Sequence, residues 1–157
     1  MKSMLLVLTL SLAFAGFAQQ STKAQSGDQV ANKSKIFIYR DKGKIKGPFF
    51  NVSKVPLSVY SDEKEMAVID AGHYFVAHLE PGKHTLHSND QHSGVQMEIE
   101  PNKEYFVRIN VESVFPKVHG SLELTTEEQG KREVQGLQPL KAKLVRDRER
   151  VTVTEKP

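Results

Sequence analysis

Between residues 35 and 124 the chain alternates short apolar runs with turn signals, and this rhythm constrains its fold more than any other feature. The clearest run, residues 95–99, alternates apolar and polar side chains with the period of a half-buried strand. Turn-forming groups such as Glu80-Pro81-Gly82-Lys83 and Pro101-Asn102-Lys103 separate the runs. About eight strands without intervening helices predict an all-β fold, an antiparallel β-sandwich or small barrel of about 7–8 short strands.

The expected strands cover residues 35–40, 55–60, 66–69, 73–79, 84–87, 95–99, 105–111 and 122–124. The first of them is apolar on both faces, which is typical of a central strand. Pro56 lacks an N–H donor, so it favours a strand start or a sheet edge.

After the strands, Thr125-Thr126-Glu127-Glu128-Gln129 resembles the capped start of a short C-terminal helix. We expect this helix to run to about Gln135, to be weakened by Gly130 and to end at Gly136. Leu137, Leu140 and Leu144 predict a second amphipathic turn opened by Pro139, and the charged residues from Arg146 onward predict a flexible basic tail.

Residues 1–18 have the pattern of a secretory signal peptide: Lys2, then an apolar run, then small residues at Gly16-Phe17-Ala18. Residues 19–34 are polar and predict a disordered leader. A β-sandwich domain over residues 35–125 and a helix with basic tail over residues 126–157 complete the expected organisation. We therefore expect an exported protein, periplasmic or secreted, that does not span a membrane and does not meet nucleic acid.

The chain of 157 residues contains no cysteine. This excludes disulfides, thiol catalysis, zinc–cysteine sites and the lipid-bearing cysteine of a lipoprotein, so we expect no lipid anchor. The formal net charge is +3, with basic stretches in residues 33–46 and from Lys141 onward. Such ends fit contact with an envelope protein, a glycan or a lipid head group, or a solvated surface without a partner.

Three motifs carry a family resemblance: Gly72-His73-Tyr74-Phe75, Pro81-Gly82-Lys83-His84 and Tyr105-Phe106-Val107-Arg108. Together they resemble a bacterial family of exported domains of unknown function, domain of unknown function 2846, over about residues 35–140. The motif residues are Gly72, Tyr74, Phe75, Pro81, Gly82, His84, Tyr105, Phe106 and Arg108. The resemblance implies a β-sandwich and no assigned activity.

Separately from the resemblance, the residues themselves indicate roles for parts of these motifs. A tyrosine at position 105 would bring its hydroxyl to a polar partner at the sheet rim. Arg108 would lie on the opposite face and pair with an acid such as Glu98, or lie along the solvent face.

The six histidines are the remaining candidates for chemistry. Within the segment from His84 to His92, only His87, Asp90 and His92 could converge, through a loop, to bind zinc or copper. The alternative for His84 is a hairpin residue whose imidazole bonds nearby backbone.

No G-x-S-x-G elbow, phosphate loop, dinucleotide fingerprint or H-E-x-x-H motif is present. We therefore expect a non-enzymatic protein without cofactors, which binds a partner or supports an envelope structure. A metal-binding module and an uncharacterised hydrolase stay open as alternatives.

Overall fold

The computed structural model describes residues 32–43, 55–114 and 117–157. The predicted signal peptide and nearly all of the predicted leader lie outside the described residues. Within the described part of the chain, no helix is both long enough and apolar enough to cross a membrane.

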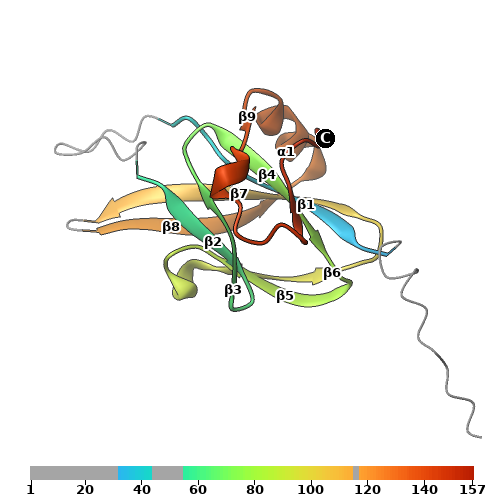
Figure 1. Cartoon of the computed structure of the whole chain (residues 1–157). Helices are drawn as coiled ribbons and strands as arrows, with labels where there is room; N and C mark the ends of the chain where they lie inside the picture. The colour runs from blue at the N-terminus through green and yellow to red at the C-terminus, as the bar shows by residue number, and fades with distance from the viewer. Residues whose placement is uncertain (1–31, 44–54, 115–116) are drawn as a thin grey trace, which may run out of the picture.

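The described residues form two packed β-sheets and a short C-terminal helix (Figure 1). The strands are β1 (Ser34–Arg40), β2 (Leu57–Ser61), β3 (Lys64–Ile69), β4 (His73–Leu79), β5 (Gly82–His87), β6 (Val95–Ile99), β7 (Glu104–Val114), β8 (Lys117–Thr125), β9 (Gln138–Pro139) and β10 (Val151–Thr152). The first sheet has the order β10-β4-β1-β7-β8, with β9 beside β4, and the second has the order β3-β2-β5-β6. The β-rich fold was predicted, β1 to β8 overlap the eight expected strands, and β1 is central as expected; β9 and β10 were not predicted.

The first sheet is mixed, which corrects the prediction of a purely antiparallel fold. β1 pairs antiparallel with β4 on one side but parallel with β7 on the other, with Ile38 opposite Val107. β9 also runs parallel to β4. Between β1 and β7 the chain visits the second sheet twice, so β1 and β7 are neighbours in space but not in sequence. Strand patterns record which side chains are buried and not the direction of the neighbouring strand, so the sequence did not reveal this pairing.

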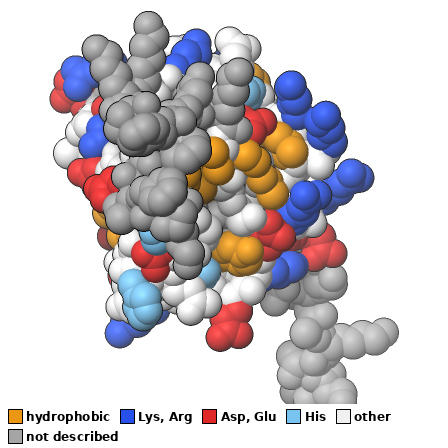
Figure 2. Space-filling view, turned by 90° about the vertical axis from the view of Figure 1, so that its left-hand side faces the viewer, with side chains coloured by type: hydrophobic (Ala, Val, Ile, Leu, Met, Phe, Trp, Pro, Cys, Tyr) orange, Lys and Arg blue, Asp and Glu red, His pale blue; other side chains and the backbone are white. Residues whose placement is uncertain are grey.

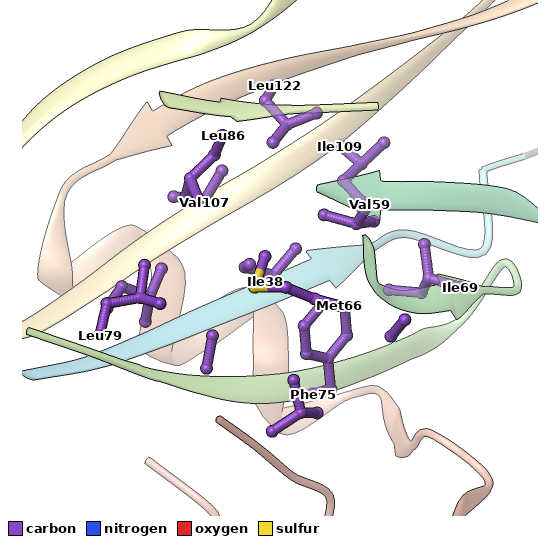
Figure 3. Packing of buried hydrophobic residues seen from close by; sticks show 14 of the residues in the cluster. Ile38, Val59, Met66, Ile69, Phe75, Leu79, Leu86, Val107, Ile109 and Leu122 are labelled. Atoms are coloured by element: carbon purple, nitrogen blue, oxygen red, sulfur yellow. The ribbon is translucent and has the colours of Figure 1, made fainter. Parts of the chain in front are cut away.

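The main hydrophobic core lies between the two sheets (Figure 3). Ile38, Phe75 and Val107 come from the first sheet, and Val59, Met66 and Leu86 from the second; all six side chains are fully buried. These positions follow the alternation of their strands, and every strand except β9 contributes a buried side chain to this core.

A second core lies on the opposite face of the first sheet, beneath helix α1 (Glu127–Gln135). The Phe37 and Phe106 rings stack there with centroids 4.9 Å apart. The predicted helix is confirmed, and the Thr126 side chain accepts a hydrogen bond from the Gln129 N–H at its start. Gly130 faces the sheet: a Cβ at this position would lie 2.2 Å from Phe106 Cβ. The glycine that weakens the helix in isolation is therefore what lets it approach the sheet.

The C-terminal segment differs from its prediction. Residues 138–139 form β9 rather than opening a second amphipathic turn, and a short 3-10 turn, η3, follows at Ala142–Leu144. The tail expected to be flexible from Arg146 onward contains β10, in which Val151 pairs with Ala77 of β4. Part of its charge is used inside the fold, because buried Asp147 pairs with Arg150 and Lys64. The segment completes the first sheet, so the folded body extends beyond residue 125.

Candidate functional site

The Gly72, Tyr74 and Phe75 motif builds the start of β4. Gly72 has φ +78°, a backbone conformation that favours glycine, in the turn before the strand. The Tyr74 ring is buried in the second core, and the Phe75 ring in the main core. The two aromatic rings of this motif therefore pack into the cores on opposite faces of the first sheet.

The Pro81, Gly82 and His84 motif forms the turn into β5. Gly82 has φ +132°, which only glycine adopts readily. His84 Nδ1 lies 3.0 Å from the Asp62 carboxylate, and its Nε2 lies 3.0 Å from the Glu80 carbonyl oxygen. The contact with nearby backbone confirms the expectation that His84 is a hairpin residue. Burial alone would raise the pKa of Asp62, but hydrogen bonds from the Thr85 N–H and from His84 hold it below its ordinary value.

The third motif lies on β7. As expected, the Tyr105 hydroxyl reaches a polar partner: it accepts a hydrogen bond from the Glu100 N–H at 2.9 Å. Phe106 belongs to the second core. Arg108 donates to Glu123 at 2.8 Å and to Glu133 of α1 at 3.2 Å. The predicted pairing with Glu98 is wrong, because Glu98 lies on β6 in the other sheet.

Arg108 is part of a polar network that joins α1 to the first sheet. The Tyr39 hydroxyl donates to Glu133 at 2.7 Å, and Gln129 donates to the same carboxylate at 2.9 Å. Burial raises the pKa of Tyr39 well above its ordinary value, and Glu133 adds to this effect. For Glu133 itself, these hydrogen bonds and the charge of Arg108 outweigh burial and lower the pKa. The network therefore fixes the position of α1, because Tyr39 and Arg108 of the first sheet both donate to Glu133 of this helix.

The structure does not bring the candidate metal ligands His87, Asp90 and His92 together. His87 is buried, with Nδ1 2.7 Å from the Ser88 carbonyl and Nε2 3.1 Å from the Asp62 carbonyl. Asp90 instead caps the 3-10 turn η2 (Gln91–Ser93), where it accepts from the His92 N–H. Across the described ranges, no three His, Asp or Glu side chains are placed to hold one metal ion.

A surface depression of about 480 Å³ lies over the outer face of the second sheet, next to the β5–β6 loop. We call it the tyrosine depression; its lining residues are Ser58, Tyr60, Glu63, His87, Ser88, Asn89 and Gln91. The Tyr60 ring stacks on the His87 ring with centroids 4.9 Å apart. Because both nitrogens of His87 face carbonyl oxygens, the ring is fixed and holds Tyr60 in place.

The β5–β6 loop is tied to both sheets. The Ser88 hydroxyl donates to the Ser58 carbonyl at 3.0 Å. The Asn89 side chain donates to the Val118 carbonyl at 2.8 Å and accepts from the Gly120 N–H at 3.1 Å. The depression therefore has a fixed wall.

Sequence reasoning missed two residues here. Tyr60 has the pattern of any aromatic residue in a strand, and His119 is one of the six histidines but lies outside the segment from His84 to His92. His119 lies on β8, far from the β5–β6 loop in sequence, yet its Nδ1 is 3.6 Å from Asp90. It lines a second depression, of about 630 Å³, on the other side of the loop. Only the packing of β8 against this loop could reveal it.

A family model described as "Protein of unknown function (DUF2846)" matches residues 30–121. The chain belongs to the DUF2846 family. The matched part runs from just before β1 into β8 and includes all the motif residues named above, together with the tyrosine depression. Helix α1 and strands β9 and β10 follow it. Searches of curated proteins and of solved structures found no match for this DUF2846 chain.

Proposed function

We propose that this DUF2846 chain is an exported, non-enzymatic binding domain of the bacterial envelope, and that the tyrosine depression is its ligand site. Export is supported by the signal-peptide pattern of residues 1–18. The observation that carries the binding proposal is the Tyr60 ring, held by the stacked His87 ring at a surface depression. A site whose parts are already in place spends less of its binding free energy on ordering side chains.

The histidines support binding rather than catalysis. Each ring nitrogen of His84 and of His87 lies 2.7 to 3.1 Å from an oxygen that can only accept a hydrogen bond. A general base or a metal ligand needs a ring nitrogen with a free lone pair. A neutral imidazole donates from one nitrogen only, so in each of these two rings one nitrogen can donate to its neighbour while the other faces an oxygen of the protein rather than a ligand.

The lining of the tyrosine depression favours a glycan as the ligand. Tyr60 offers an apolar ring with a polar tip, which suits the mixed surface of a sugar. Glu63, Asn89 and Gln91 add an acceptor and two amides around it. Its volume of about 480 Å³ falls in the usual range for small-molecule sites.

The test is a calorimetric titration of the purified protein with soluble cell-wall glycan fragments. Glu63→Gln and Gln91→Ala alter the depression, whereas Glu98→Gln and Gln96→Ala are matched changes on exposed positions of β6 in the same sheet. We expect saturable binding that the first pair weakens by at least about fivefold and the second pair leaves unchanged. Absence of saturable binding, or equal losses in both pairs, would refute the proposal. A parallel calorimetric titration with zinc and copper tests the metal-binding alternative. Heat of binding at micromolar protein would support that alternative.

A further inference from the structure

The residues after α1 form a segment that is anchored along one flank of the sandwich. Leu140, Val145 and Val151 bury their side chains in the main core. Backbone bonds fix the path between them: the Leu140 N–H donates to Tyr74 at 2.8 Å, and the Arg146 N–H donates to Met66 at 2.9 Å. The segment thus contacts β4 of the first sheet and β3 of the second.

Two of the three acids in residues 141–157 are used to hold this segment. Asp147 pairs with Arg150 at 2.6 Å and with Lys64 at 2.8 Å. Glu155 pairs with Lys35 of β1 at 2.7 Å. Glu149 is the third acid, and its side chain is exposed.

Four cations of the same segment point into solvent, and we call them the cationic platform: Lys141, Lys143, Arg146 and Arg148. All four are exposed, and within the described part of the chain none of their side chains has an ion pair or hydrogen bond. In Figure 1 the segment that contains η3, drawn in red, lies at the front of the molecule. The front of Figure 1 is the right-hand side of Figure 2, where several Lys and Arg side chains gather along the edge. Two of the three acids of the segment, Asp147 and Glu155, are paired with other cations, so the four cations outnumber the one remaining acid, Glu149, and the platform keeps a net positive charge.

We propose that the cationic platform docks this protein on an anionic phospholipid surface. None of the four residues lines either depression described above. Exposed cations spread over a firmly anchored segment instead suit the diffuse negative charge of a lipid surface. The inference rests on the proposed export for its location in the envelope, but not on the tyrosine depression.

The expected strength follows from the charge count. One Lys or Arg close to an anionic bilayer strengthens binding by about fivefold, so four independent cations strengthen it by about 600-fold. Such binding is reversible. It weakens sharply with salt, because the screening length falls from about 10 Å at 0.1 M to about 3 Å at 1 M.

The experiment is co-sedimentation of the purified protein with vesicles of phosphatidylcholine alone and of phosphatidylcholine mixed with phosphatidylglycerol. The platform variant replaces Lys141, Lys143, Arg146 and Arg148 with Gln. The matched control replaces four exposed cations elsewhere, Lys42, Lys83, Lys103 and Arg132, with Gln and has the same net charge. We expect the unmodified protein and the control to bind the mixed vesicles at low salt but not in about 1 M salt, and the platform variant to bind at least about tenfold more weakly.

Two results would overturn the proposal. Equal losses in the platform variant and the control would show that net charge alone causes binding. Binding to heparin or DNA but not to the mixed vesicles would assign the platform to another polyanion. Thermal melting checks the fold of each variant. If the fourfold variant is unstable, the double variant Lys143→Glu and Arg148→Glu, changed at two exposed positions, replaces it in the co-sedimentation experiment. Failure here leaves the glycan titration unaffected, so the two proposals can fail separately.

Discussion

Replacing Asp147 with Asn tests whether the C-terminal segment is held by a buried ion pair. The Asp147 side chain is only 2% exposed, and its Oδ2 lies 2.6 Å from Arg150 Nε. Burial alone would raise the pKa of Asp147, but the hydrogen bonds and charges of Lys64 and Arg150 outweigh it and lower the pKa from 3.8 to about 2. That gap corresponds to about 2 kcal/mol of stabilisation. Lys64 is 60% exposed, so we assign most of this to Arg150.

The sign of the pH dependence follows from the lowered pKa. The stabilisation is complete above pH 3.8, the ordinary value, and is lost as the pH falls towards 2. Asp147→Asn has nearly the same shape, and its amide oxygen can still accept from the Glu149 and Arg150 N–H groups that bond Asp147. We therefore expect the variant to lose about 2 kcal/mol of unfolding free energy at pH 7, with the difference from the unmodified protein shrinking below pH 4.

Denaturant unfolding at pH 7, 4 and 2.5 measures these differences. Glu149→Gln, an exposed neighbour, is the control, and we expect it to change the unfolding free energy by less than about 0.5 kcal/mol. The reasoning fails if Asp147→Asn is as stable as the unmodified protein at pH 7. It fails equally if the loss is as large at pH 2.5 as at pH 7.

Two further substitutions test the packing of α1 and of the β5–β6 loop. Gly130→Ala improves helix propensity but places a Cβ 2.2 Å from Phe106 Cβ, so we expect thermal melting to show a loss of about 1–3 kcal/mol. Gly136→Ala, where the nearest atom would lie at 3.9 Å, should change stability little, and a stable Gly130→Ala would contradict the close approach. Asn89→Ala removes both hydrogen bonds to β8, so exchange of the Gly120 amide hydrogen should accelerate at least about fivefold; an unchanged rate would show that the loop is held by other contacts.

The candidate site was only partly predictable from the sequence. The segment from His84 to His92 was identified, and it does form one wall of the tyrosine depression. The use of its side chains was not predictable, because the hydrogen-bond partner of His87 across the sheet is the carbonyl of Asp62 in another hairpin. Tyr60 looks like any aromatic residue in a strand until the register places it opposite His87.

By itself, the sequence determined the local structure of this protein. Alternation places Met97 and Ile99 on one face of β6, and the chemistry of Pro81 and Gly82 sets the turn before β5. Thr126 begins the helix because its side chain can cap the first turn. These features depend on residues that are close in the chain, so their patterns can be read directly.

Only the tertiary structure decided which distant segments meet. It placed β7 parallel to β1, brought Glu123 and Glu133 to Arg108, and turned the expected flexible tail into β10 and a buried ion pair at Asp147. Strand order and side-chain partners depend on which surfaces bury each other most completely, and no short pattern in the sequence records that choice.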